Sequence, residues 1–123
     1  WETDFAGFLD RDTGGTVQWW QRNPVRKPWS VQVLLADGRA FFPDFIVGIR
    51  GRPKEHGALL ADTKYAFELR KEIPKILAEH AVYGRALLLH RTGDQQWSIV
   101  RFHPDSGHAT LGELFRLADA VGY

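Results

Sequence analysis

The sequence predicts an α/β domain in which helices pack on a mixed β-sheet. Three observations support this prediction. Short apolar segments recur along the chain with turn signals between them, as strands do. Two segments space their apolar side chains as one face of a helix does. The second of these segments lies between two apolar strands, which is the arrangement of a crossover that joins parallel strands.

The first half of the chain predicts one helix followed by strands in hairpins. Apolar side chains three and four residues apart predict a helix over residues 2–10. Asp37-Gly38 is a strong signal for a tight hairpin turn. Alternating, β-branched and aromatic segments predict the strands, and these cover residues 16–20, 31–35, 41–49 and 58–64. The polar segment 48–57 is the expected loop before the last of these strands.

The second half predicts a helix between two strands and a helix at the end. Apolar spacing predicts a helix over residues 72–82, with Pro74 in its first turn and Gly84 just beyond its end. Strands are expected over residues 85–90 and 96–102, and a short helix is expected over residues 111–120. The strand before the crossover helix and the strand after it should be parallel.

Composition fits one soluble domain and excludes several classes of site. The chain has 123 residues, 44% of them hydrophobic, which suits a single domain over residues 1–123. It has no cysteine, so disulfides, thiolate zinc sites and a cysteine nucleophile are excluded. No apolar run approaches the roughly 20 residues of a membrane span, and no signal peptide pattern opens the chain. We expect a cytoplasmic protein without membrane contact, and the absence of methionine suggests a domain excised from a larger protein.

Two carboxylates and one lysine form the candidate catalytic cluster. Asp44 lies in the apolar run Phe41–Val47, where a carboxylate is costly unless it is paired or bound to a metal. Asp62 and Lys64 end an apolar strand two residues apart, so they share a face. If the two strands are neighbours, both carboxylates can converge on one cation. Oxygen ligands of this kind suit Mg²⁺ or Mn²⁺ rather than zinc.

Pro43-Asp44 followed by Asp62-Thr63-Lys64 resembles the signature of the PD-(D/E)XK nucleases. The order of the predicted elements around this motif is also similar to that family. The chain most resembles nuclease domains appended to DEAD/DEAH-type helicases and to type III restriction-like proteins, over most of its length. The resemblance implies a restriction-endonuclease-like fold, a nuclease-like domain and Mg²⁺-dependent hydrolysis of DNA.

The same resemblance implies a role for each matched residue. Asp44, Asp62 and the backbone carbonyl of Thr63 would bind Mg²⁺ or Mn²⁺, and Lys64 would position or deprotonate the attacking water. Glu2 matches the acid of the family's first helix and is a candidate further ligand. The expected partners are nucleic acid and a helicase or translocase module in the same protein, with a homodimer as another arrangement seen among such nucleases.

Other interpretations of the cluster stay open. Asp44 and Lys64 could form a structural ion pair, or the chain could be a catalytically inactive nucleic-acid-binding module of the same fold. With a net charge of only +1, nucleic-acid binding would have to come from local charge. Arg50, Arg52 and Lys54, with His56, lie in the loop expected beside the site and are candidates for phosphate contacts or for a solvated hairpin tip.

The remaining notable residues favour structural roles. Lys71 and Lys75 could reach phosphate, but exposed helix lysines commonly have no such role. One of Trp19 and Trp20 is expected in the core rather than stacked on bases. The segment from His103 to His108 is expected to be a turn rather than a metal site. No glycine-rich phosphate loop is present, which argues against nucleotide hydrolysis.

Overall fold

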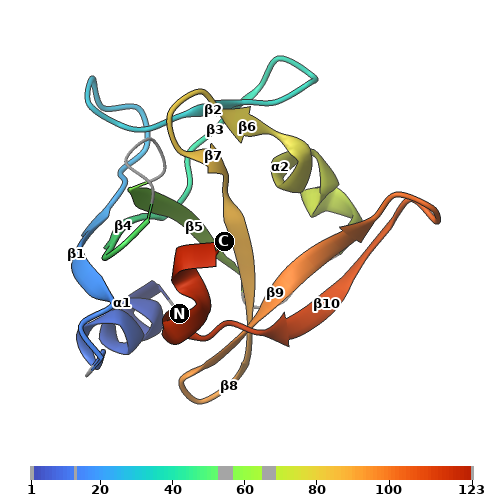
Figure 1. The fold of residues 1–123 in the computed structure, drawn as a ribbon. Coiled ribbons are helices and arrows are strands. Elements are labelled where there is room, and N and C mark those ends of the chain that lie inside the picture. The colour runs from blue at the N-terminus through green and yellow to red at the C-terminus, as the bar shows by residue number, and fades with distance from the viewer. Residues whose placement is uncertain (1, 13, 53–56, 65–68, 123) are drawn as a thin grey trace.

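A computed structural model of the chain describes residues 2–12, 14–52, 57–64 and 69–122, and Figure 1 shows its fold. The centre is a six-stranded mixed sheet with the order β1-β4-β5-β8-β9-β10. These strands are β1 (Val17–Arg22), β4 (Phe45–Ile49), β5 (Ala58–Lys64), β8 (Leu87–Gly93), β9 (Gln96–His103) and β10 (His108–Leu114). Strands β5 and β8 pair in parallel, and the other neighbours are antiparallel. The predicted mixed sheet and parallel crossover are confirmed.

Short helices and two small ribbons surround this sheet. The helices are α1 (Glu2–Asp10), the 3-10 helix η2 (Leu69–Glu72), α2 (Ile73–Leu77) and the 3-10 helix η3 (Leu117–Gly122). One ribbon pairs β2 (Val33–Leu34) with β3 (Ala40–Phe41), and the other pairs β6 (Glu79–His80) with β7 (Gly84–Arg85). Helix α1 and strand β5 have the bounds that the sequence predicts. In the described part of the chain, a membrane-crossing helix of sufficient length and apolarity is absent.

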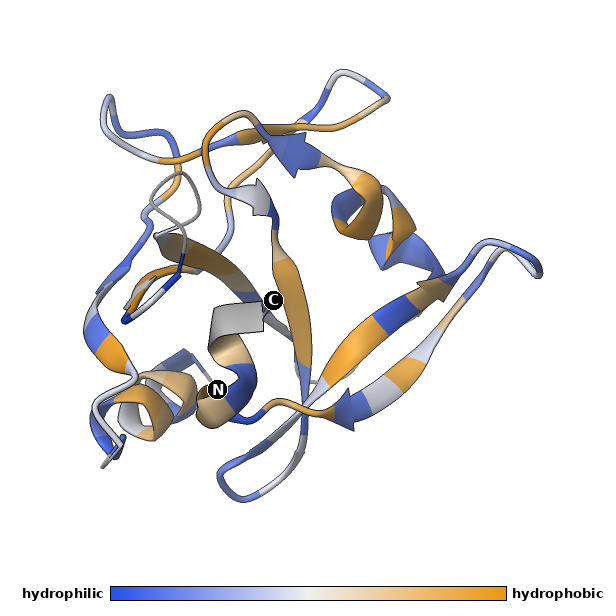
Figure 2. Cartoon of the chain, viewed as in Figure 1, coloured by the Kyte–Doolittle hydropathy of each residue, from blue (hydrophilic) through white to orange (hydrophobic). Residues whose placement is uncertain are grey.

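The two faces of the sheet bury separate apolar clusters. On one face, α1 and η3 lie together and contribute Phe5, Leu9 and Ala120 to a cluster that includes Phe45 of β4. The ribbons cover the other face, where residues of β2 and β3 pack against alternate residues of β4 and β5. Figure 2 shows the first parts of β5 and β8 as hydrophobic, and the buried residues there include Leu59, Leu60, Leu88 and Leu89.

The strand expected over residues 41–49 is two strands in two different sheets. Strand β3 ends at Phe41 and β4 begins at Phe45. Pro43 lies between them and has no N–H to donate to a ladder, so pairing stops there. The expectation of one continuous strand over residues 41–49 is therefore wrong.

The helix expected over residues 72–82 is also shorter than predicted. Helix α2 ends at Leu77, although Pro74 does lie in its first turn. His80 belongs to β6, and its Nδ1 accepts hydrogen bonds from the amides of Val82 at 3.0 Å and Tyr83 at 3.2 Å. Gly84 has φ of 73° and opens β7 instead of ending a helix. The side-chain acceptor of His80 stabilises a tight turn that replaces the helix.

The helix expected over residues 111–120 is wrong for most of its length. Residues 108–114 form β10, which pairs with β9, and only η3 is helical. The expected turn after His103 is present and returns the chain along β9. Gly112 weakens a helix at this point, whereas seven residues of strand gain a ladder of hydrogen bonds. Pairing with a neighbouring strand therefore overrides the helical spacing of the leucines.

Candidate active site

Asp44 and Asp62 face each other across the ends of β4 and β5. The antiparallel register pairs Phe45 with Ala61, and one further step sets Asp44 opposite Asp62. The Asp44 amide donates a hydrogen bond to Asp62 Oδ1 at 3.1 Å. Residues in opposite positions of an antiparallel pair have Cβ atoms about 4.5–5.5 Å apart. The structure thus brings the Asp62 carboxylate to the Asp44 backbone, and the charge of Asp44 acts on Asp62.

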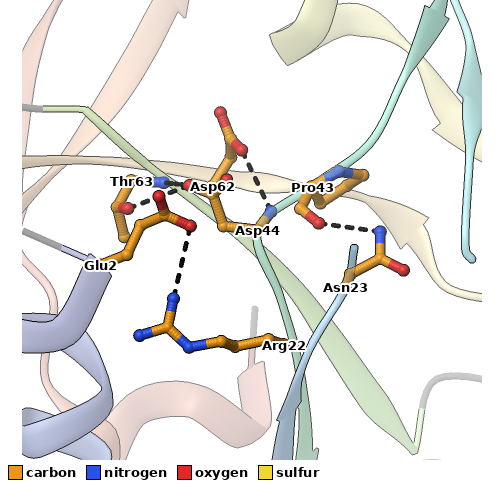
Figure 3. Close-up of polar contacts among 7 residues, drawn as sticks. All are labelled: Glu2, Arg22, Asn23, Pro43, Asp44, Asp62 and Thr63. Carbon is orange, nitrogen blue, oxygen red and sulfur yellow. Dashed lines mark hydrogen bonds and ion pairs between the residues drawn. The ribbon is translucent and has the colours of Figure 1, made fainter. Parts of the chain in front are cut away.

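Thr63 fixes the carboxylate of Asp44. Its amide and its hydroxyl donate to Asp44 Oδ2 at 2.9 Å and 3.0 Å. Figure 3 shows these contacts beside the Asp62 carboxylate, which reaches the Asp44 backbone. Among the described residues, no hydrogen bond is donated to the other Asp44 oxygen, Oδ1. Asp44 is therefore oriented by the protein and retains an oxygen that can bind a cation.

Pro43 interrupts the ladder beside Thr63. The β4–β5 ladder ends at the pair of Phe45 with Ala61, so Pro43 and Thr63 lie two residues beyond it. Pro43 has no N–H, and its carbonyl accepts instead from Asn23 Nδ2 at 2.8 Å. The N–H and the carbonyl of a strand residue point to the same edge, so the Thr63 carbonyl faces Asp44 without a ladder donor from position 43. The Thr63 carbonyl is therefore a candidate third oxygen ligand.

Asn23 holds the Pro43-Asp44 backbone in place. This residue is only 5% exposed. Its amide N–H donates to the Asp44 carbonyl at 2.8 Å, and its side chain donates to the carbonyls of Val31 and Pro43, each at 2.8 Å. Its Oδ1 also accepts from the Val31 amide at 2.8 Å. The sequence does not predict this role, because a buried asparagine is not distinguishable from a turn asparagine by its neighbours.

Asp62 is a buried carboxylate with a strongly altered ionisation. It is 2% exposed, and among the described residues no hydrogen-bond donor reaches its Oδ2. Lys64 Nζ forms an ion pair with that oxygen at 3.3 Å. Burial, and secondly the charge of Asp44, raise the pKa of Asp62 from 3.8 to about 7, although Lys64 and Lys75 act in the opposite direction. Without a bound cation, Asp62 is therefore only partly ionised at neutral pH.

Lys64 lies against Asp62 at the end of β5. Burial alone lowers the pKa of Lys64, but the charges of Asp62 and Glu72 outweigh burial and leave the pKa raised. The structural ion pair considered for Asp44 and Lys64 instead joins Asp62 and Lys64. Lys64 is thus a charged ammonium group held next to the two carboxylates.

Glu2 is held by a different partner. Its Oε1 lies 3.7 Å from a guanidinium nitrogen of Arg22, and both side chains are about half exposed. Within the ranges that the structure describes, no three His, Cys, Asp or Glu side chains are arranged to hold a metal ion. The structure therefore does not place Glu2 as a ligand together with Asp44 and Asp62.

Arg50 and Arg52, the described basic residues of the loop, lie at the opposite end of the strands from the acids, so the expectation that these two lie beside the acids is wrong. The loop joins the end of β4 to the start of β5, whereas Asp44 precedes β4 and Asp62 lies near the end of β5. Five strand residues span roughly 15 Å. Arg50 Nε donates to the Gly15 carbonyl at 2.8 Å, and Arg52 donates to the Ala120 carbonyl at 3.2 Å. Lys54 and His56 lie outside the described residues.

The other singled-out residues lie mostly in structural positions. Trp20 packs on Phe45 and donates from Nε1 to Asp10 at 2.7 Å, whereas Trp19 and Trp29 are 48% and 62% exposed. His103 contacts Thr110 across the β9–β10 hairpin at 2.6 Å. Lys75, in contrast, lies near the acids and pairs with Glu72.

Comparisons with known proteins add no identification. No protein family matches the sequence, and neither a curated protein nor a solved structure gives a significant match.

Proposed function

We propose that the chain is a Mg²⁺- or Mn²⁺-dependent nuclease of the PD-(D/E)XK type that hydrolyses phosphodiester bonds in DNA. The observation that carries this proposal is the hydrogen bond from the Asp44 amide to the Asp62 carboxylate, one residue beyond the Phe45–Ala61 pair, with Lys64 ion-paired to the same carboxylate. The restriction-endonuclease-like fold is part of the proposal. It is supported by the order of a leading helix, antiparallel strands, and a crossover from β5 to the parallel strand β8.

The oxygen atoms at this site fit a hard divalent cation. Two carboxylates placed directly opposite each other are destabilising unless a cation or a proton offsets their repulsion. Asp44 Oδ1, Asp62 Oδ2 and the Thr63 carbonyl are the atoms that would hold the metal, and oxygen is the ligand that Mg²⁺ prefers. When bound, the cation supplies charge stabilisation at the phosphate and acidifies a water molecule.

Lys64 supplies the cationic group of the protein itself. Its ammonium contacts Asp62 Oδ2 at 3.3 Å, and that contact weakens when the carboxylate shares its charge with a metal ion. The released ammonium can donate hydrogen bonds to a phosphate oxygen or orient the attacking water. Because the side chain remains 28% exposed, a substrate can reach it without local unfolding.

The alternative is a catalytically inactive nucleic-acid-binding module of the same fold. The specific observation in its favour is the Asp62–Lys64 ion pair, which partly compensates the buried carboxylate without any metal. An inactive module should bind nucleic acid in a salt-dependent manner but should neither cleave it nor require a divalent cation.

Cleavage assays with matched variants test the proposal. Single-stranded and duplex DNA and RNA are incubated with the purified chain in Mg²⁺, in Mn²⁺ or in EDTA. Asp62→Asn and Lys64→Ala are expected to lower the cleavage rate at least about 100-fold. Asp105→Asn removes the same charge from an exposed acid in the β9–β10 turn and should cleave like the parent.

Two measurements interpret the result of these assays. Circular dichroism verifies that each variant is folded, and titration with Mn²⁺ measures metal binding. Full activity in either site variant would contradict the nuclease mechanism. Salt-dependent DNA binding without cleavage in any metal would assign the inactive module instead.

A further inference from the structure

A second ion pair lies close to the acids on the chain that follows β5. Glu72 ends η2 and Lys75 lies in α2, and their charged groups are 3.5 Å apart. The Glu72 side chain is only 10% exposed, and among the described residues no hydrogen bond reaches its Oε2. The Lys75 ammonium also lies 5.0 Å from the centre of the Phe41 ring. Glu72 and Phe41 therefore hold Lys75 in a defined position.

Lys75 is linked electrostatically to the candidate active site. It interacts with both Lys64 and Asp62, and Glu72 acts on Lys64. Two neighbouring lysines repel each other unless anions compensate them, and here Lys64 is paired with Asp62 at 3.3 Å and Lys75 with Glu72 at 3.5 Å. Both ammonium groups remain partly accessible, with side-chain exposures of 28% for Lys64 and 24% for Lys75, whereas the two carboxylates are buried. The ammonium groups of Lys64 and Lys75 are therefore accessible to solvent, whereas the carboxylates of Asp62 and Glu72 that pair with them are buried.

We infer that Lys64 and Lys75 together form a phosphate-binding site, in which Lys75 contacts the substrate and Glu72 competes with the substrate for Lys75. This inference rests on the proposed function and names the substrate group that the site receives. A lysine ammonium is a compact point charge with three donors, which suits a phosphate oxygen. Glu72 and Lys75 are not needed to hold a metal ion, so their placement beside Lys64 is accounted for by the substrate.

The net charge of the cluster points to a phosphodiester rather than a free phosphate. When all groups are ionised, the carboxylates of Asp44, Asp62 and Glu72 and the two ammonium groups leave one net negative charge. A divalent cation changes this to one net positive charge. An internal phosphodiester, with a single negative charge, then balances the site, whereas inorganic phosphate carries more charge than the site can neutralise. Nucleic acid should therefore bind here more tightly when the metal is present.

Oligonucleotide binding tests this site with two variants, one expected to weaken the binding and the other expected to tighten it. The probe is a fluorescent single strand of DNA without terminal phosphates, and the titration is made in Ca²⁺ at several salt concentrations. Lys75→Gln should weaken binding about five- to tenfold and reduce the slope of log affinity against log salt by about 0.7. Glu72→Gln, which removes the competing anion but keeps the shape, should tighten binding about two- to fivefold.

Controls separate a binding role from a structural one. Arg116→Gln removes one positive charge from an exposed residue next to Phe115, which packs on the opposite face of the sheet, and should leave binding unchanged. Lys75→Arg should restore most of the affinity, and thermal unfolding confirms that each variant is folded. Unchanged binding by Lys75→Gln would overturn the inference. So would weaker binding by Glu72→Gln, since a purely structural ion pair fails in the same direction whichever partner is removed.

The outcomes also distinguish this inference from the proposed function. If Lys75→Gln weakens binding but the parent never cleaves nucleic acid, the phosphate site stands and the nuclease proposal falls. If the parent cleaves and Lys75→Gln has an unchanged KM, the nuclease proposal stands and this inference falls. Inorganic phosphate that displaces the oligonucleotide at equal concentration of phosphate groups would overturn the assignment to a phosphodiester.

Discussion

The two ends of the β4–β5 pair carry charged residues in very different surroundings. At one end, Asp62 is 2% exposed and lies opposite Asp44. At the other end, Arg50 is exposed and donates to a backbone carbonyl. Burying a charge in the first setting is costly without a compensating partner, whereas a hydrated charge in the second setting costs little. A candidate site is therefore better identified by the burial and register of its charges than by their density along the sequence.

This difference has consequences for stability as well as for chemistry. The acidic end retains a buried carboxylate with a raised pKa, and a raised pKa in the folded state means that ionisation of Asp62 destabilises the fold. The remote end contains packing contacts and exposed hydrogen bonds. Variants at the acidic end should therefore change the free energy of unfolding by several kcal/mol, and variants of the exposed charged residues at the remote end should change it little.

The largest change in stability is expected for Asn23→Ala. The variant loses three side-chain hydrogen bonds and leaves backbone groups of Val31 and Pro43 without partners. Unpaired buried polar groups cost about 1–3 kcal/mol each, so the free energy of unfolding should fall by about 3–5 kcal/mol. Urea unfolding measures this loss. Gln21→Ala, at an exposed position of β1, is the control, and a loss below about 1 kcal/mol in Asn23→Ala would show that Asn23 does not hold the acidic end.

A pH-dependent change of similar size is expected from Asp62. Because its pKa is about 7 in the folded protein and 3.8 as the ordinary value, the folded state binds a proton more tightly than the unfolded state. Stability due to this group is present at low pH and is lost as pH rises from 4 to 7. The loss is on the order of 3–4 kcal/mol, at about 1.4 kcal/mol for each pH unit.

Urea unfolding in EDTA at pH values from 4.5 to 7.5 measures this effect. The difference between the parent and Asp62→Asn isolates Asp62 from the other carboxylates, and it should grow in favour of the variant as pH rises. Mg²⁺ at pH 7.5 should stabilise the parent and not the variant. Parallel pH profiles of the two proteins would mean that the ionisation of Asp62 does not destabilise the fold.

The sequence was sufficient for the parts of the fold that local patterning dictates. Helix α1 and strand β5 follow from apolar spacing and from a run of buried residues. The convergence of Asp44 and Asp62 also followed, because neighbouring antiparallel strands joined by one loop leave few alternatives for their register. The same antiparallel geometry predicts that the connection between β4 and β5 lies away from the acids. This connection joins the end of β4 to the start of β5, whereas Asp44 precedes β4 and Asp62 lies near the end of β5.

The features that the sequence does not predict depend on contacts between residues that are distant along the chain. Leu111 and Leu114 have helical spacing, but pairing with β9 makes this segment a strand. Asn23 acquires its role from Val31 and Pro43, which no local pattern brings beside it. For Lys75 the sequence left a phosphate contact and an ordinary exposed helix lysine both open, and its proximity to Asp62 arises from how the chain returns after β5.

A moderate effect is expected at the remote end from Gly48→Ala. A Cβ atom at position 48 would lie 2.3 Å from Trp19 Nε1. Trp19 is 48% exposed, so its ring can move outward, and overpacking of this kind costs about 1–3 kcal/mol. Tryptophan fluorescence should shift to longer wavelength, and urea unfolding should detect the loss. Gly14→Ala, where the nearest side-chain atom is 3.7 Å away, should leave both signals unchanged. An unaltered spectrum in Gly48→Ala would show that Trp19 does not cover this end of β4.

The smallest effect is expected from Arg50→Gln. The variant removes one exposed hydrogen bond to the Gly15 carbonyl, which solvent can replace, so the free energy of unfolding should change by less than about 0.5 kcal/mol. Because Arg50 lies at the end of β4 remote from Asp44, cleavage and oligonucleotide affinity should also stay within about twofold of the parent. Anisotropy titration beside the Lys75→Gln variant provides the measurement. A tenfold loss of affinity in Arg50→Gln would break the distinction between the two ends, because nucleic acid would then extend along the whole length of the β4–β5 pair and both ends would contribute to its binding.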